Sequence, residues 1–106
     1  MSKANLPNTS LDDMKILQSS SFKKKVRRLR KQEKKILDTQ VLKIVKDPAI
    51  GQEKKGDLRG IFVLKFKIHA TQYLLSYRLT GDNLELIMIG SHENYYRELS
   101  SYLKKR

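Results

Sequence analysis

Lys65, Lys67 and His69 are the first side chains in this sequence whose types and spacing could serve chemistry. They alternate with apolar residues in LKFKIH, residues 64 to 69. On a β-strand they would line one face, about 6 to 7 Å apart from one to the next. A ladder of cationic and ionisable groups at that spacing matches a phosphate backbone. Lysine is also common on the solvent side of a strand, and a histidine near a strand end can be a bystander, so both interpretations stay open.

A second candidate group lies in IGSHENYYREL, residues 89 to 99. If Ser91 caps a helix, His92 lies in the first turn and Tyr96 follows on the same helical face. A histidine there could be a general acid or base, and Tyr96 could stack on a nucleotide base. His92 could equally be a cap or a surface residue. Tyr95 lines up with the apolar residues of the helix and is expected in the core.

The chain is strongly basic, with 23 lysines and arginines against 11 acids in 106 residues and a formal net charge of +12. Nine of the basic residues lie in KKKVRRLRKQEKK, residues 23 to 35. Such a charge suits RNA, DNA, an anionic membrane surface or an acidic protein, although a basic run can also be a solvated helix face. The residues expected to contact a polyanionic substrate are Lys23, Lys24, Arg27, His69, Arg78 and Arg97.

The residues available exclude or disfavour several other chemistries. Cysteine is absent, so disulfides, thiolate catalysis and cysteine-bound zinc are ruled out. Two histidines without a supporting carboxylate pattern argue against a zinc site. GQEKKG, residues 51 to 56, has the wrong spacing for a phosphate-binding glycine loop, and Glu85 and Glu93 form no recognisable two-metal set. We therefore expect no metal and no cofactor.

No apolar run in the sequence is long enough to cross a membrane. The N-terminus, MSKANLPNTSLDD, lacks the apolar stretch of a secretory signal. We therefore expect the protein in the cytoplasm, with no membrane partner. These first 13 residues are polar and are expected to be a mobile tail.

The remaining residues, 14–106, indicate one α+β domain. A short apolar alternation at Met14 and Ile16 predicts a strand that ends at the serines of positions 19 to 21. Apolar residues then recur at helical spacing over positions 22 to 46, without glycine or proline. This segment is either one long helix or a hairpin whose turn would lie in RKQEKK, residues 30 to 35. Asp47-Pro48 ends the helical region, because proline disfavours helical geometry in the residue before it.

The second half of the chain predicts an antiparallel meander. Residues 51 to 60 contain three glycines and are expected to be a loop. Strands are predicted over 61–69, 73–79 and 84–89, with Thr80 to Asn83 as a turn. A last helix would follow Ser91. Its buried residues would be Tyr95, Leu99, Tyr102 and Leu103.

From about Met14 to Lys105 the chain resembles the RelE/ParE superfamily of bacterial toxins. The matching pieces are the basic helical region, the Asp47-Pro48 stop, KKGDLRG at 54 to 60, LKFKIHATQYLLSYRL at 64 to 79 and the closing IGSHENYYREL. The resemblance implies a helical hairpin packed on a small, curved antiparallel sheet with a C-terminal helix. By position, Lys65 and Lys67 match the strand lysines of the RelE-like ribonucleases. His92 falls where these enzymes place a C-terminal arginine or histidine.

By the same resemblance, Tyr96 falls where these enzymes place an aromatic residue. The sequence departs from the family's pattern at one position. Leu74 stands where many of the ribonucleases carry an arginine that holds the transition-state phosphate. In a RelE-like mechanism, Lys65 and Lys67 would stabilise charge, His92 would be the acid, and Lys65 or His69 the base. Leu74 would leave the arginine's role unfilled or pass it to Lys67, His69 or Arg78.

The superfamily implies two functions of different kinds. RelE-like members are metal-independent endoribonucleases that cut mRNA on the ribosome and thereby inhibit translation, and this is the function we expect. ParE-like members inhibit DNA gyrase without being enzymes, which is the alternative. In either case we expect a cognate antitoxin protein as partner, and in the first case mRNA on the ribosome as well.

Overall fold

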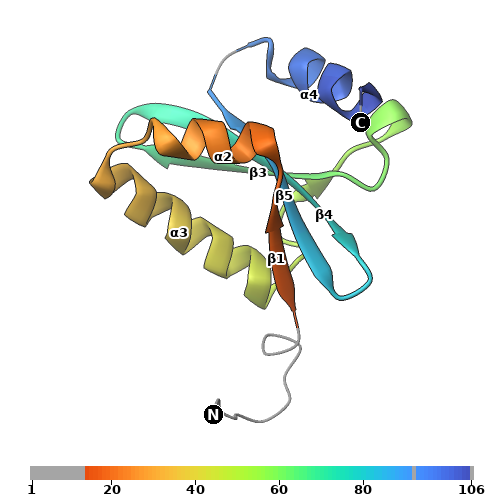
Figure 1. The fold of residues 1–106 in the computed structure, drawn as a ribbon, viewed down its shortest axis with the longest axis horizontal. Helices are drawn as coiled ribbons and strands as arrows, with labels where there is room; N and C mark the ends of the chain where they lie inside the picture. Colours follow the sequence, from red (N-terminus) through yellow and green to blue (C-terminus); the bar gives the residue numbers. More distant parts are fainter. Residues whose placement is uncertain (1–13, 92, 106) are drawn as a thin grey trace, which may run out of the picture.

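A computed structural model describes residues 14–91 and 93–105. Residues 1–13, which we expected to be a tail, lie outside the described residues. The elements, in chain order, are β1 (Lys15–Gln18), α2 (Ser20–Arg27), α3 (Lys31–Lys46), β2 (Gln52–Glu53), the 3-10 turn η1 (Gly56–Leu58), β3 (Phe62–Ile68), β4 (Thr71–Thr80), β5 (Asn83–Gly90) and α4 (Tyr95–Lys104). The predicted fold class, α+β, is confirmed, as is the hairpin of α2 and α3 beside a sheet (Figure 1).

The strands form one five-stranded sheet in the order β1-β5-β4-β3-β2. Its centre is the predicted antiparallel meander, β3 with β4 and β4 with β5. The strand β1 was predicted, but its parallel pairing with β5 at one edge was not. The strand at the other edge, β2, pairs antiparallel with β3 and was not predicted. The segment from 51 to 60, predicted to be all loop, therefore contains a two-residue strand and a 3-10 turn. Among the described residues, no helix is long and apolar enough to cross a membrane.

The helical hairpin turns earlier than the polar run RKQEKK indicated. The residue that ends α2 is Arg27, and α3 already begins at Lys31, with Arg30 at its N-cap. The backbone N–H of Arg30 donates to the Glu33 carboxylate at 2.7 Å. This contact is half of a capping box, which stabilises a helix start. Residues 31–35 are therefore the first turn of α3, and the turn lies at 28–30.

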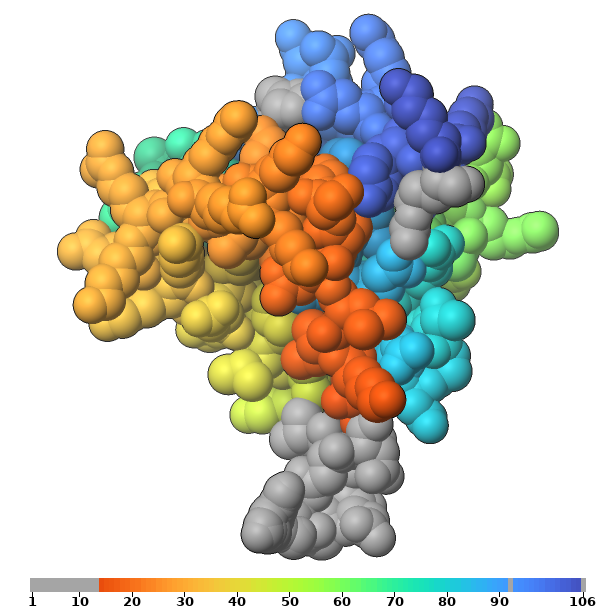
Figure 2. Space-filling view, viewed as in Figure 1, coloured from red at the N-terminus to blue at the C-terminus, as the bar shows by residue number. Residues whose placement is uncertain are grey.

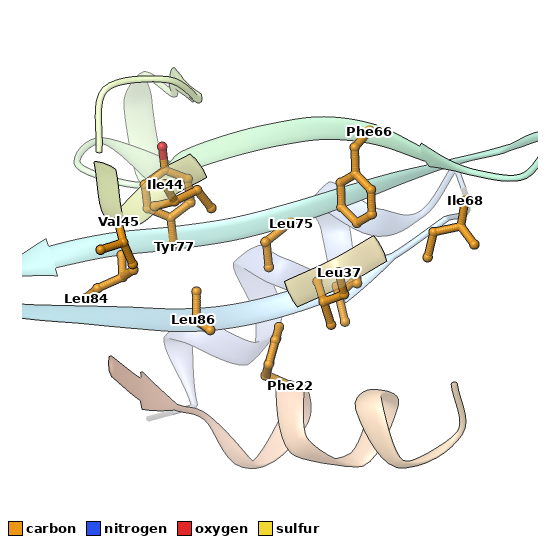
Figure 3. Packing of buried hydrophobic residues seen from close by; sticks show 11 residues of the cluster. Phe22, Leu37, Ile44, Val45, Phe66, Ile68, Leu75, Tyr77, Leu84 and Leu86 are labelled. Carbon is orange, nitrogen blue, oxygen red and sulfur yellow. The ribbon is translucent and has the colours of Figure 1, made fainter. Parts of the chain in front are cut away.

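The main core lies between the hairpin and one face of the sheet (Figure 3). Phe22 from α2 and Leu37 from α3 pack toward Leu75 and Leu86 of the central strands. Beside them the Tyr77 hydroxyl donates to the Pro48 carbonyl at 2.7 Å and accepts from the Gly51 N–H at 2.9 Å. A Cβ at position 51 would come within 2.7 Å of that hydroxyl, so this close approach requires glycine. The contact fixes how α3 is joined to β2.

A second, smaller core lies on the opposite face of the sheet, under α4. Alternate residues of β4 divide between the two, because Leu75 belongs to the main core and Leu74 packs on the second. Tyr95 and Leu99 of α4 are fully buried here, as predicted. The Tyr95 hydroxyl donates to the Met88 carbonyl at 2.7 Å, and burial raises its pKa above the ordinary value.

The predicted cap of α4 is wrong. The residue at the N-cap is Asn94, and the helix begins at Tyr95. Ser91 instead directly follows Gly90, the last residue of β5. The start of the helix is displaced because the chain must leave the end of β5 and turn back before Tyr95 can reach Met88 in the same strand.

Candidate nucleic-acid interface

Lys65 and Lys67 lie exposed on β3, on the face of the sheet that carries α4. Their neighbour Phe66 points the other way, into the main core. Lys65 pairs directly with Leu74 of β4, and Lys67 pairs with Gln72. Directly paired residues present their side chains on the same face. These four side chains therefore form one surface beside the helix.

Part of this surface lines a hollow of about 330 Å³, here called the Lys65 hollow. Its lining residues are Lys65, Gln72, Leu74, Ser91, Glu93 and Tyr96. The structure thus brings two predicted site residues, Lys65 and Tyr96, to one place although they lie far apart in the sequence. Lys67 is one strand step further along the same face but does not line the hollow.

The ring of Tyr96 is positioned by two neighbours. Tyr95 meets it edge to face, with ring centroids 5.5 Å apart and an angle of 89° between the planes. The Lys54 ammonium lies 4.9 Å from the centre of the Tyr96 ring, a cation–π geometry. That ammonium also donates to the Gln52 side-chain oxygen at 3.2 Å. A half-buried aromatic ring is thus held beside Lys65, which suits stacking on a nucleotide base.

The sequence did not reveal two members of this site. Lys54 lies in a segment without periodicity, so nothing in the sequence indicated that it would reach Tyr96. The carboxylate of Glu93 lines the hollow with Lys65, whereas its sequence context showed only a scattered acid. A carboxylate beside a lysine can accept a proton. Without Glu93, Lys65 would be the residue of this lining left to accept it.

The prediction that His69 continues the lysine ladder is wrong. The strand ends at Ile68, and His69 has a φ of 56° in the two-residue turn to β4. Tight hairpins favour a first turn residue with positive φ. The sequence has no glycine at this point, and histidine adopts that region more readily than most residues do. His69 therefore lies at the hairpin tip, and only Lys65 and Lys67 form the ladder.

The other predicted residues have different surroundings. The prediction for His92 lies outside the described residues. Arg78 forms an ion pair with Glu85 at 2.9 Å. On β4, Arg78 lies four residues beyond Leu74, a separation of about 13 Å at the usual rise of a strand. Arg97 is exposed on α4 and is absent from the lining of the hollow. The structure therefore does not bring Arg78 or Arg97 to the Lys65 hollow.

The basic residues of α2 project outward from the part of the molecule that lies next to α4 (Figure 2). Lys23, Lys24 and Arg27 are all exposed. Figure 2 shows the side chains of this orange segment reaching away from the body of the molecule, with the dark blue α4 beside it. Of these three, Lys24 lines a hollow, together with Ser20, Arg28 and Tyr102. Among residues 14–91 and 93–105, no cluster of three or more histidine and acidic side chains is arranged to hold a metal ion.

Comparison with known proteins identifies the family. The model of a family described as ParE-like toxin of type II bacterial toxin–antitoxin system matches residues 16–100. The chain belongs to this family of ParE-like toxins. Its predicted membership of the RelE/ParE superfamily is confirmed. A search of curated proteins finds no match.

Two of the solved structures similar to this ParE-like toxin come from E. coli. The free toxin RelE with two arginines mutated has a TM-score of 0.66 and 18% identity, over 87% of this chain and 95% of that chain. The intact RelBE toxin–antitoxin complex matches with a TM-score of 0.61 and 18% identity, over 74% of this chain and 96% of that chain. At this identity the likeness establishes the fold alone.

Proposed function

We propose that this ParE-like toxin is an endoribonuclease that needs no metal, cuts mRNA on the ribosome and so inhibits translation in the cytoplasm. A cognate antitoxin would hold it inactive. The observation that carries the proposal is the shared hollow of Lys65 and Tyr96, with Lys67 next on the same strand face. A cation and a stacking ring at one site suit a single RNA nucleotide and its phosphate.

The proposed reaction uses the RNA's own 2′-hydroxyl. Its oxygen forms a bond to the adjacent phosphorus, and the bond from phosphorus to the 5′-oxygen breaks, which yields a cyclic phosphate and a 5′-hydroxyl. The protein must accept the 2′-proton, stabilise negative charge on the phosphoryl oxygens and donate a proton to the leaving oxygen. Charge stabilisation is usually the largest of these contributions, and Lys65 and Lys67 supply it here.

The proton donor and acceptor are assigned in different ways. His92, which the resemblance places at the acid's position, donates the proton to the 5′-oxygen. His69 lies at the hairpin tip, so the acceptor is Lys65 or Glu93, which line the same hollow. Glu93→Gln decides between them. Loss of cleavage with unchanged RNA binding assigns the base to Glu93, and retained cleavage assigns it to Lys65.

Leu74 shapes how this site differs from many RelE-like ribonucleases. It lines the hollow with an apolar side chain opposite Lys65. A leucine cannot hold a phosphoryl oxygen, so the negative charge falls to the two lysines. Leu74 can instead pack against the face of a sugar or base, which adds to the orientation that Tyr96 provides.

The experiment that tests the proposal maps RNA ends after brief expression of the toxin. We expect new 5′-hydroxyl ends within coding regions for the wild type and none for Lys65→Met. Lys43→Met is the matched control, because it removes the same charge from an exposed position on α3, away from the hollow. It should cleave like the wild type. Equal cleavage by Lys65→Met and the wild type would refute the assigned site.

The alternative function is inhibition of DNA gyrase, which the match to a ParE-like family favours. Such an inhibitor needs no proton transfer and no base-stacking ring. A gyrase supercoiling assay on the same purified protein separates the two. Inhibited supercoiling without new RNA ends would replace the ribonuclease proposal.

A further inference from the structure

We propose that a second hollow, between α2 and α4, binds a backbone phosphate of the RNA whose scissile phosphate lies at Lys65. This α2–α4 hollow has a volume of about 300 Å³. Its lining residues are Ser20, Ser21, Lys24, Lys25, Arg28 and Tyr102. The inference rests on the proposed function and adds a place where the same substrate is anchored.

The lining has the chemistry of an oxyanion site. It combines three cations with three hydroxyl groups, and none of its six residues is acidic. Arg28, the C-cap residue of α2, follows Lys24 by four positions and keeps helical backbone angles, so the two side chains project from the same side. The Ser20 hydroxyl lies 3.4 Å from the Tyr102 hydroxyl, which joins the two helices across the hollow. Phosphate oxygens can accept from all six side chains, and such charge-assisted bonds are the strong ones.

The crowding of like charge adds a second reason. Lys24, Lys25 and Arg28 lie within five positions of one another, and among the described residues none forms an ion pair with a carboxylate. Their mutual repulsion is relieved when an anion lies among them. α2 offers no acid to do so, since its sequence is SSFKKKVR.

Shared lining residues link this hollow to the Lys65 hollow. Between them is a middle hollow of about 200 Å³, which shares Lys25 and Arg28 with the first and Ser91 with the second. The middle hollow is also lined by Tyr73 and Gly90, so the path passes the end of β5. One acid, Glu33, lines it too, and its carboxylate accepts from the Arg30 N–H. A single strand with its base on Tyr96 can follow this path to α2.

The test measures binding of a fluorescent, single-stranded oligoribonucleotide that is methylated at every 2′-oxygen and so cannot be cut. Lys24→Gln/Arg28→Gln is compared with Lys31→Gln/Lys35→Gln. The second pair has the same spacing and the same loss of charge, and it lies exposed on α3 outside the three hollows.

We expect the first pair to weaken binding about tenfold or more, as charge-assisted hydrogen bonds are lost. It should also reduce the log–log salt slope by about 0.7 for each phosphate contact removed. The α3 pair should lose far less. Equal losses in the two double variants would overturn the site, because the overall positive charge of the protein would then account for binding. Absence of RNA binding by the wild type would overturn it as well.

A second variant places a repelling charge in the hollow without weakening the helix. Ser20→Asp adds a carboxylate in the first turn of α2, where the helix dipole favours it. Gln32→Glu adds the same charge in the first turn of α3. Only Ser20→Asp should reduce RNA binding. If it and Lys24→Gln/Arg28→Gln leave RNA binding unchanged but weaken antitoxin binding, the hollow holds an acidic side chain of the antitoxin and the inference is wrong.

The binding test separates this inference from the proposed function. The probe cannot be cleaved, so selective loss in the Lys24→Gln/Arg28→Gln variant would support the site even if the wild type never cut RNA. Conversely, RNA ends that depend on Lys65, together with equal losses in the two double variants, would keep the ribonuclease and remove the second site.

Discussion

Tyr96 is the residue whose surroundings say most about substrate. The Lys54 ammonium covers one side of the ring at 4.9 Å, and Tyr95 packs edge-on against it. A base can therefore stack only where these two neighbours leave the ring open. The cation behind the ring would also attract the phosphate attached to the stacked nucleotide. In the proposed role the aromatic ring supplies the stacking face, and the hydroxyl is not required.

We expect Tyr96→Ala to lose about 1 to 3 kcal/mol of RNA binding, the usual contribution of one stacked base. Tyr96→Phe keeps the stacking face and should remain close to the wild type. Titration of the uncut, methylated oligoribonucleotide measures both. Wild-type affinity in Tyr96→Ala would mean that no base stacks there.

We propose His92 as the proton donor because of its position in the sequence and the resemblance to histidine-using ribonucleases. His92→Gln keeps the size and a hydrogen-bonding group but cannot transfer a proton. General acid–base groups contribute about 10² to 10⁴-fold, so cleavage and growth arrest should fall by that amount. Binding of the antitoxin should persist. A fully toxic His92→Gln that cuts RNA at the wild-type rate would favour the gyrase alternative.

The placement of α2 depends on one buried serine. Ser19 is 8% exposed, and its hydroxyl accepts from the Phe22 N–H at 3.0 Å while donating to the Ile87 carbonyl. Its own N–H donates to the Leu86 carbonyl at 3.0 Å. Ser19 therefore caps the helix and ties it to β5 at once. The cations of α2 have their positions because of this contact.

We expect Ser19→Ala to lower the free energy of unfolding by about 2 kcal/mol, since it removes a cap and leaves a buried carbonyl without its donor. Urea denaturation measures the loss. Ser21→Ala, at the second residue of the same helix, is the control and should change stability little. A loss equal in both variants would mean that the effect is helix propensity and not the cap.

The sequence predicted those elements whose own pattern is strong. Strict alternation gave β3, and the helical spacing of apolar residues gave the hairpin and the buried face of α4. It could not predict contacts that depend on distant segments. Lys54 reaches Tyr96 only because β2 joins the sheet edge, and β1 pairs with β5 only after the whole intervening chain has folded.

Two local errors had local causes. The polarity of RKQEKK predicts a turn, although Arg30 and Glu33 form a helix start. Alternation predicts His69 as a strand residue, although the hairpin needs two residues to turn. For the site, spacing predicted Lys65 and Lys67 on one strand face. The meeting of Lys65 with Tyr96 and Glu93 follows from how α4 packs on the sheet.

The whole molecule carries too much positive charge to neutralise itself. With 23 basic residues against 11 acids, at least half of the cations cannot have an acidic partner within the chain. The ion pair of Arg78 with Glu85 is one that forms among the described residues. The unbalanced cations repel each other in the folded protein and attract a polyanion or an acidic antitoxin. The same charge therefore destabilises the free toxin and drives its binding.

Salt should act on these two effects with opposite sign. Screening shortens the range of repulsion from about 10 Å at 0.1 M to about 3 Å at 1 M, so the thermal midpoint of the free toxin should rise with sodium chloride. Binding of the methylated RNA should weaken steeply over the same range, because each phosphate contact releases counterions. Differential scanning fluorimetry and anisotropy measure the two on one preparation. A thermal midpoint that falls with salt would show that internal ion pairs outweigh the repulsion, and RNA affinity that stays flat would remove the electrostatic basis for substrate binding along the path from Lys65 to Arg28.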